Sequence, residues 1–247
     1  MRRNLLLCLL ILNFLFLISF VHSQSSVGVG VQITDTSGPI INLIEPTNNS
    51  GDIDGNITFS YNASDASTVS NCSLMINDKT NITDISITKN TRINFRLNNT
   101  AIGKYNWSIN CTDSLGFAGN SSERTFSVVL MSNFNGSTTN LSAVDLRNIT
   151  NFVVELTSLG KVNFSENVDI SGGLDLNKYV NISLNRIELN SSALSALNKS
   201  ATLQLFGLTS SNPRILRDGA VCPSSICTKI SYSGGTLIFN VTQFTVY

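Results

Sequence analysis

Apolar and polar residues alternate in many short stretches of this chain. Between residues 103 and 113, Tyr105, Trp107, Ile109 and Cys111 occupy every second position, with a polar residue between each pair. A period of two is typical of a β-strand with one buried face. Segments of this kind, separated by Asn, Asp, Gly and Ser, predict about seven strands in residues 39–131, as in a small β-sandwich. They are Ile40–Ile44, Asn56–Asn62, Asn71–Asn77, Ile85–Thr88, Arg92–Leu97, Tyr105–Cys111 and Thr125–Leu130.

A second set of strands follows a polar stretch. Residues 132–140, rich in Asn, Ser, Thr and Gly, predict a linker, and residues 141–247 predict a second β-rich, sandwich-like domain. We expect either a domain that ends on its own last strand or a longer protein that is cut short. Residues 191–200 predict one or two helical turns. The expected strands are Val144–Leu146, Phe152–Leu156, Lys161–Phe164, Val180–Leu184, Ala201–Phe206, Lys229–Tyr232 and Thr236–Val241.

The first 23 residues have the pattern of a secretory signal peptide. Arg2 and Arg3 precede an apolar run, Leu5–Phe20, and Val21-His22-Ser23 places suitable residues before a cleavage site. The alternative is an uncleaved anchor helix, for which the apolar run is short. Cleavage leaves a Gly/Ser/Thr-rich lead-in at residues 24–38 and predicts a secreted, extracellular or envelope-associated protein.

Cleavage also limits the available chemistry. The chain has a single histidine, His22, which would leave with the signal peptide. Without it, a Ser-His-Asp or Cys-His catalytic site and a His-ligated metal site are excluded. The formal charge of the whole chain is zero and becomes slightly acidic when Arg2 and Arg3 leave, and no basic stripe is present, so nucleic acid is not an expected partner. No second long apolar run follows, so we expect no transmembrane anchor in this chain.

Four cysteines remain after removal of Cys8, an even number that predicts disulfides in an exported chain. Four cysteines allow three pairings, and spacing favours Cys72–Cys111 and Cys222–Cys227. The order of the strands suggests that the first bridge joins neighbouring strands of one sheet.

Seventeen Asn-x-Ser/Thr triplets meet the sequence rule for N-glycosylation. Alternating polar strand positions generate such triplets without selection for sugar, so an uncharged polar face is the alternative explanation. The glycosylation candidates on the outward phase of predicted strands are Asn56, Asn62, Asn71, Asn106, Asn110, Asn163, Asn181 and Asn240.

The acidic residues give only a weak metal signal. In an immunoglobulin-like sandwich, the loops after the Asn56 and Trp107 strands lie at one end, which would bring Asp65 and Asp113 close together. We therefore note these two as weak calcium candidates, and otherwise expect no metal or cofactor; the alternative is that both cap turns. The stretch Asp35–Gly38 is interpreted as a turn. No sequence pattern places two acids across a cleft, so we predict no catalytic residues and no enzyme.

Four stretches of the first half, "GPIINLIEPTNNS", "NITFSYNASD", "NCSLMIND" and "GKYNWSINCTDSLGFAGN", resemble immunoglobulin-like modules of secreted prokaryotic surface proteins, especially archaeal ones. In the second half, "DLNKYVNISL", "LNKSATLQLFGL", "PRILRDGAVC" and "GGTLIFNVTQFTVY" resemble a module that often accompanies them. The resemblance implies a glycosylated, envelope-associated protein without catalytic residues.

Together these observations predict an all-β chain: two tandem immunoglobulin-like β-sandwich domains after a cleaved signal peptide. The expected function is that of a noncatalytic structural or adhesive cell-surface protein, whose partners would be other envelope or surface proteins, or glycans. The alternative is a carbohydrate-binding or accessory module of a larger secreted enzyme.

Overall fold

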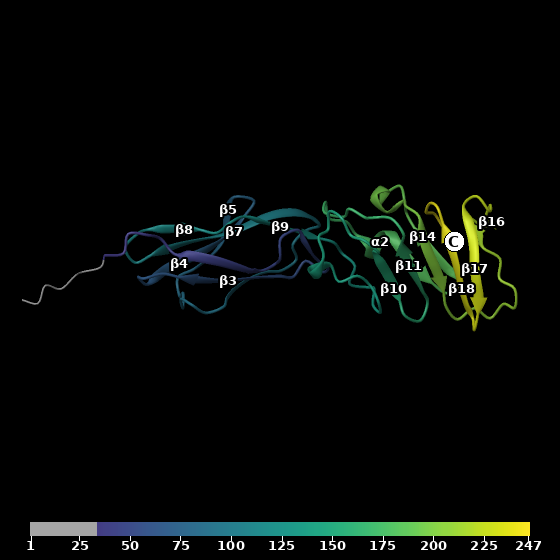
Figure 1. Ribbon diagram of the computed structural model, residues 1–247, viewed down its shortest axis with the longest axis horizontal. Coiled ribbons are helices and arrows are strands. Elements are labelled where there is room, and N and C mark those ends of the chain that lie inside the picture. Colours follow the sequence, from purple (N-terminus) through teal and green to yellow (C-terminus); the bar gives the residue numbers. More distant parts are fainter. Residues whose placement is uncertain (1–33) are drawn as a thin grey trace, which may run out of the picture. The chain divides into compact units, whose positions relative to one another are not determined.

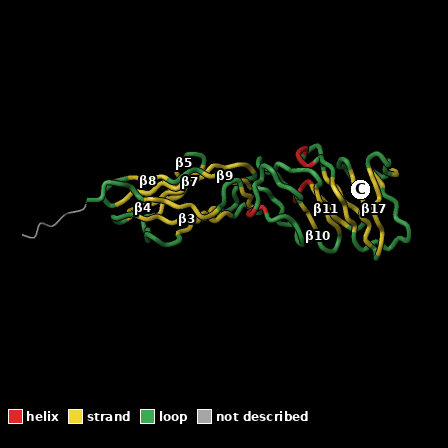
Figure 2. Tube along the Cα trace, in the orientation of Figure 1, coloured by secondary structure: helices red, strands yellow, loops and turns green. Residues whose placement is uncertain are grey.

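The computed structural model describes residues 34–247. The predicted signal peptide and most of the predicted lead-in lie outside this range. The described chain consists of strands, loops and a few short helical turns (Figures 1 and 2). The all-β prediction is therefore confirmed.

Two sheets form an immunoglobulin-like sandwich in the first half of the described chain (Figure 1). The smaller sheet has the order β1-β3-β6 and the larger has β2-β9-β7-β4-β5, with β8 paired to β7. All pairings are antiparallel except that of β2 with β9. The strands are β1 (Ile40–Glu45), β2 (Ser50–Asp52), β3 (Ile57–Ser64), β4 (Val69–Ile76), β5 (Lys79–Asp84), β6 (Ile93–Leu97), β7 (Gly103–Asp113), β8 (Ala118–Asn120) and β9 (Arg124–Val128).

Aromatic side chains fill the space between these sheets. Phe59 meets Trp107 and Phe126 edge to face, with ring centroids 5.1 and 5.4 Å apart. This geometry is one of the favoured arrangements for aromatic pairs. All three rings are buried, which agrees with the inward phase predicted for Trp107.

The strand predicted at residues 85–88 is wrong. The chain instead turns at Asn77 and Asp78, both with positive φ, and β5 follows immediately at Lys79. Two consecutive residues of positive φ form the tight hairpin turn that suits twisted strands. Strand β5 lacks a regular apolar set, because among its six residues only Ile82 is apolar. Strands β2 and β8, of three residues each, were not predicted either.

The second half contains a five-stranded antiparallel sheet of order β10-β11-β14-β18-β17. Helix α2 and the β12–β13 hairpin contribute to the same hydrophobic core, and residues 245–247 pair with β13 through backbone hydrogen bonds. The elements are β10 (Val153–Leu156), β11 (Gly160–Phe164), α2 (Leu176–Tyr179), β12 (Val180–Ser183), β13 (Arg186–Leu189), β14 (Ala201–Leu205), β15 (Leu216–Arg217), β16 (Ala220–Val221), β17 (Cys227–Ser233) and β18 (Thr236–Val241).

One local prediction differs from the structure of this half, at residues 144–146, whereas the one or two helical turns predicted at residues 191–200 agree with it. Residues 144–146 form no strand, because they follow the 3-10 turn η1 (Leu141–Ala143), which Asn140 caps through its side chain. The predicted helical stretch at 191–200 contains one 3-10 turn, η2 (Ser195–Leu197).

The segment predicted as a linker lies along the edge of β10. Asn135 and Thr139 donate their backbone N–H groups to the carbonyls of Glu155 and Val153. The Thr138 and Thr139 hydroxyls accept from the backbone N–H groups of Glu155 and Val153. This segment is therefore held along its length by the strand beside it.

Candidate metal centre

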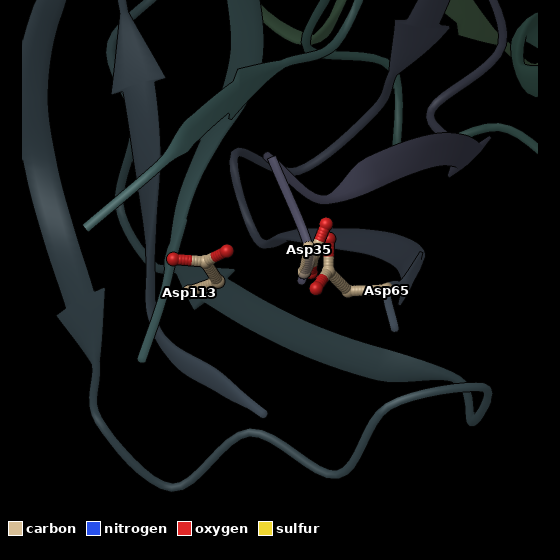
Figure 3. Close-up of side chains that lie close together, drawn as sticks. All are labelled: Asp35, Asp65 and Asp113. Atoms are coloured by element: carbon tan, nitrogen blue, oxygen red, sulfur yellow. The ribbon is translucent and has the colours of Figure 1, made fainter. Parts of the chain in front are cut away.

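Asp65 and Asp113 lie at one end of the first sandwich. Asp65 directly follows β3, and Asp113 is the last residue of β7. The structure brings them together with a third acid, Asp35, which precedes β1 (Figure 3). One carboxylate oxygen from each residue lies within 4.8 Å of those of the other two. We call Asp35, Asp65 and Asp113 the aspartate cluster.

Asp113 is the buried member, with 2% of its surface exposed. Its Oδ1 accepts hydrogen bonds from the backbone N–H groups of Leu115 and Phe117, each at 2.8 Å. This side chain therefore closes the tight turn 113–117, as Asp commonly does. Its Oδ2 is also buried, but has no hydrogen-bond partner in the described part of the chain.

Asp35 is held against the loop that contains Asp65. Ser67 donates its hydroxyl and its backbone N–H to Asp35 Oδ2, at 2.7 and 3.1 Å. The backbone of the segment that follows Asp35 packs directly on β8. A Cβ on Gly38 would lie 2.2 Å from the Ala118 carbonyl oxygen, and a Cβ on Gly119 would lie 1.9 Å from that of Pro39. Only glycine permits this approach, which brings the segment that follows Asp35 against β8.

Asp65 stands in a loop whose carbonyls are bound by a lysine. The Lys89 ammonium donates to the backbone carbonyls of Asp65, Ala66 and Ser67, at 2.9, 3.1 and 2.9 Å. Asp65 Oδ1 accepts the backbone N–H of Ser67 at 2.7 Å. Within residues 34–247, no Lys or Arg forms an ion pair with any carboxylate of the aspartate cluster.

The electrostatics of the cluster reflect this crowding. Partial burial raises the pKa of Asp65, and the neighbouring carboxylates of Asp35 and Asp113 add to the effect. The Ser67 hydroxyl, followed by the Ser37 backbone N–H, lowers the pKa of Asp35 well below its ordinary range. Neighbouring acids whose pKa values move in opposite directions can share a proton. Hard oxygen ligands of this kind suit Ca²⁺ or Mg²⁺.

The sequence did not predict Asp35 as a member of this site. Residues 35–38 predict a turn, and Asp35 Oδ1 does accept hydrogen bonds from the backbone N–H and the hydroxyl of Ser37. The available signal was that an acid preceded the first strand and so had to lie near the loops at that end. The sequence pattern gave no reason to place it within reach of Asp65.

The cysteines join the pairs that spacing favours, Cys72–Cys111 and Cys222–Cys227. Cys72 on β4 lies directly opposite Cys111 on β7, so this bridge joins neighbouring strands of one sheet. Both residues are fully buried in the first core.

The glycosylation candidates differ in exposure. Three have exposed side chains: Asn56, Asn181 and Asn240. The others are half-buried: Asn62, Asn71, Asn106, Asn110 and Asn163. Asn163, on the inner strand β11, has a buried Oδ1 without a hydrogen-bond partner in the described range.

A groove of about 430 Å³ lies in the second half. Leu205, Leu208, Arg214, Phe239 and Tyr247 are among its lining residues. Phe239 and Tyr247 are both buried, so neither ring offers an exposed flat face of the kind on which sugars stack.

Comparisons with known proteins give little further information. No protein-family model matches the chain. No curated protein matches its sequence. One similar solved structure is that of the fibronectin(III)-like modules of Clostridium thermocellum CbhA, which is 13% identical and covers 37% of this chain and 96% of that chain, with a TM-score of 0.29. That score is too low to support any conclusion, so the fold rests on the sheets described above. Within residues 34–247, no helix is both long and apolar enough to cross a membrane.

Proposed function

We propose that this chain is a noncatalytic extracellular structural or adhesive protein of the cell surface, N-glycosylated on its strands. In this proposal its N-terminal segment directs secretion and is then removed. Its outer surface contacts other envelope proteins or glycans.

One observation carries the proposal: in the second half, exposed asparagines of Asn-x-Ser/Thr triplets alternate along the strands with residues of a filled hydrophobic core. Along β12 the buried residues Val180 and Ile182 alternate with exposed Asn181. Along β18, Leu237, Phe239 and Val241 are buried whereas Asn240 is exposed. An uncharged polar face of this kind keeps a β-sheet hydrated and leaves room for a glycan.

The disulfides support an oxidising compartment. Both pairs are closed, and one of them lies in a fully buried position between neighbouring strands. Disulfides of this structural kind persist outside the cytosol, where glutathione and thioredoxin do not keep thiols reduced.

The alternative is a carbohydrate-binding or accessory module of a larger secreted enzyme. The groove lined by Arg214 and Tyr247 is the feature that favours it. Against it stands the placement of Trp107, the only tryptophan, whose ring is buried in the first core. We therefore place the surface role first and the binding role second.

The test is the intact mass of the native protein from its source cells, before and after reduction and thiol labelling. We expect a heterogeneous mass above that of residues 24–247, with four thiols that react only after reduction. A mass equal to the bare polypeptide would refute glycosylation and move support to the binding-module alternative. Thiols that react without reduction would refute the extracellular assignment.

A further inference from the structure

The buried carboxylate of Asp113 lacks one partner. Its Oδ1 closes the turn with the N–H groups of Leu115 and Phe117, but its Oδ2 is buried without a hydrogen bond. An ionised oxygen removed from water is costly unless a donor or a cation satisfies it. Because the turn occupies Oδ1, the unpartnered Oδ2 is the oxygen available to a ligand.

The surroundings of Asp113 add negative charge instead of compensating it. Asp35 and Asp65 place their oxygens within 4.8 Å, and no Lys or Arg of the described residues pairs with the three carboxylates. The nearby Lys89 ammonium is engaged with three backbone carbonyls of the 65–67 loop. Within residues 34–247, the aspartate cluster therefore combines three carboxylates without an ion pair to any of them, and its nearby cation, Lys89, bonds backbone carbonyls instead.

We propose that the aspartate cluster binds one Ca²⁺ ion, with Asp113 Oδ2 as its buried ligand and carboxylate oxygens of Asp35 and Asp65 as the others (Figure 3). Oxygens that share a Ca²⁺ ion at its usual bond lengths lie at most about 5 Å apart, which the cluster satisfies. Mg²⁺ demands near-ideal octahedral geometry and gives up its waters reluctantly, so an irregular set of carboxylate ligands favours Ca²⁺. Water molecules complete the shell of a calcium ion that has few protein ligands, since Ca²⁺ tolerates irregular geometry.

The ion would join three separate parts of the chain. Asp35 belongs to the segment before β1, Asp65 to the loop after β3, and Asp113 to the turn after β7. The segment before β1 is held to the loop after β3 by hydrogen bonds from Ser67 to Asp35. A Ca²⁺ ion would replace repulsion among the carboxylates with attraction and fasten this segment to both loops. This inference goes beyond the proposed surface role and does not depend on it.

The experiment uses the full purified chain, stripped with EDTA and titrated with CaCl₂. Isothermal titration calorimetry measures stoichiometry, and the fluorescence of Trp107, buried in the same sandwich, follows thermal unfolding. We expect one ion per chain. Extracellular modules bind Ca²⁺ with Kd of about 10⁻⁴–10⁻³ M, so about 10 mM should raise the melting temperature by about 3–10 °C. MgCl₂ at the same concentration should produce a smaller rise.

Asp113→Asn is the decisive variant, because its amide oxygen can still accept from Leu115 and Phe117. We expect it to lose the calcium-dependent rise while remaining at least as stable as wild type in EDTA, since the substitution removes one of three crowded charges. Asp65→Asn and Asp35→Asn should weaken calcium binding at least tenfold. If Asp113→Asn does not fold, Asp65→Asn and Asp35→Asn provide the test instead. Asp169→Asn is the matched control, since Asp169 accepts from Ser171 in the second half and lies outside the aspartate cluster.

Three results would overturn the proposal. A wild-type chain with no response to calcium would mean that the acids share a proton and bind no metal. A calcium response that persists in all three aspartate variants would place the ion elsewhere. A response that Asp169→Asn abolishes as well would show that the effect is not specific to the aspartate cluster.

Discussion

Val128 and Val129 are consecutive in the chain, yet each is fully buried in a different hydrophobic core. Val128 packs in the first sandwich, whereas Val129 packs with residues of the second half. Successive side chains of an extended chain point to opposite sides, so the end of β9 serves both cores. Directly afterwards, Leu130 donates its backbone N–H to Leu174 and accepts from the N–H of Leu176.

We expect this junction to couple the unfolding of the two cores. Val129→Ala should lower the free energy of unfolding by about 2 kcal/mol, from lost burial and the cavity that remains. It should also lower the temperature of the unfolding transition that Trp107 fluorescence reports, although this tryptophan belongs to the first core. Thermal unfolding followed by tryptophan fluorescence and by circular dichroism checks both effects.

Val221→Ala serves as the control, because Val221 is 64% exposed and its truncation leaves no buried cavity. An unmoved Trp107 transition in Val129→Ala, combined with a shifted circular dichroism signal, would show that the cores unfold independently.

The two disulfides should differ in their contribution to stability. The Cys72–Cys111 bridge has a sequence separation of 39 residues, whereas that of Cys222–Cys227 is 5. In the loop-entropy model, bridges of these spans stabilise by about 4 and about 2 kcal/mol. We therefore expect Cys72→Ala/Cys111→Ala to lose clearly more stability than Cys222→Ala/Cys227→Ala in chemical denaturation. Equal losses, or a larger loss for the short bridge, would contradict this ranking.

Glycan occupancy should follow exposure of the asparagine side chain. In secreted, folded protein we expect a glycan on exposed Asn181 and none on Asn163, whose Oδ1 is buried on an inner strand. Asn181→Gln should then reduce the intact mass by one glycan, whereas Asn163→Gln should leave the glycan mass unchanged. Loss of a glycan only in Asn163→Gln would reverse the expected order.

Strands with a clear inward apolar set were predictable from the sequence. The segment that contains Trp107 and Cys111 is strand β7, and both residues are buried there. Where the pattern is short or has few apolar residues, prediction failed. Strand β5 was missed because its alternation is weak, and the turn at Asn77 and Asp78 has a dipeptide less diagnostic than Asn-Gly.

The candidate site was predictable only in part. The proximity of Asp65 and Asp113 follows from strand order, since their loops share one end of the sandwich. Asp35 joins them through tertiary contacts, namely the bonds from Ser67 and the approach of Gly38 to β8. Such contacts depend on two backbones meeting in space, and periodicity along one segment carries no information about them.

The Glu155 carboxylate on β10 binds the segment that lies along this strand. The Ser137 hydroxyl and backbone N–H donate to the Glu155 carboxylate, and the hydroxyl is the larger cause of a pKa lowered from the ordinary 4.5. A group with a depressed folded-state pKa stabilises the fold above its unfolded pKa. That contribution to stability disappears as the pH falls through the pKa of the group in the folded state. Acidification should therefore loosen the 135–139 segment from β10.

Glu155→Gln removes this titration but keeps an oxygen that can accept from Ser137. We expect wild type to be more stable than Glu155→Gln near pH 7, and the difference in melting temperature to shrink as the pH falls from about 6 to about 3. Other acids with lowered pKa values, such as Glu166, titrate in both proteins and cancel in this difference. Glu123→Gln is the control, because the Glu123 side chain is exposed. A difference that stays constant across this range would show that the Ser137 contacts do not depend on the charge of Glu155.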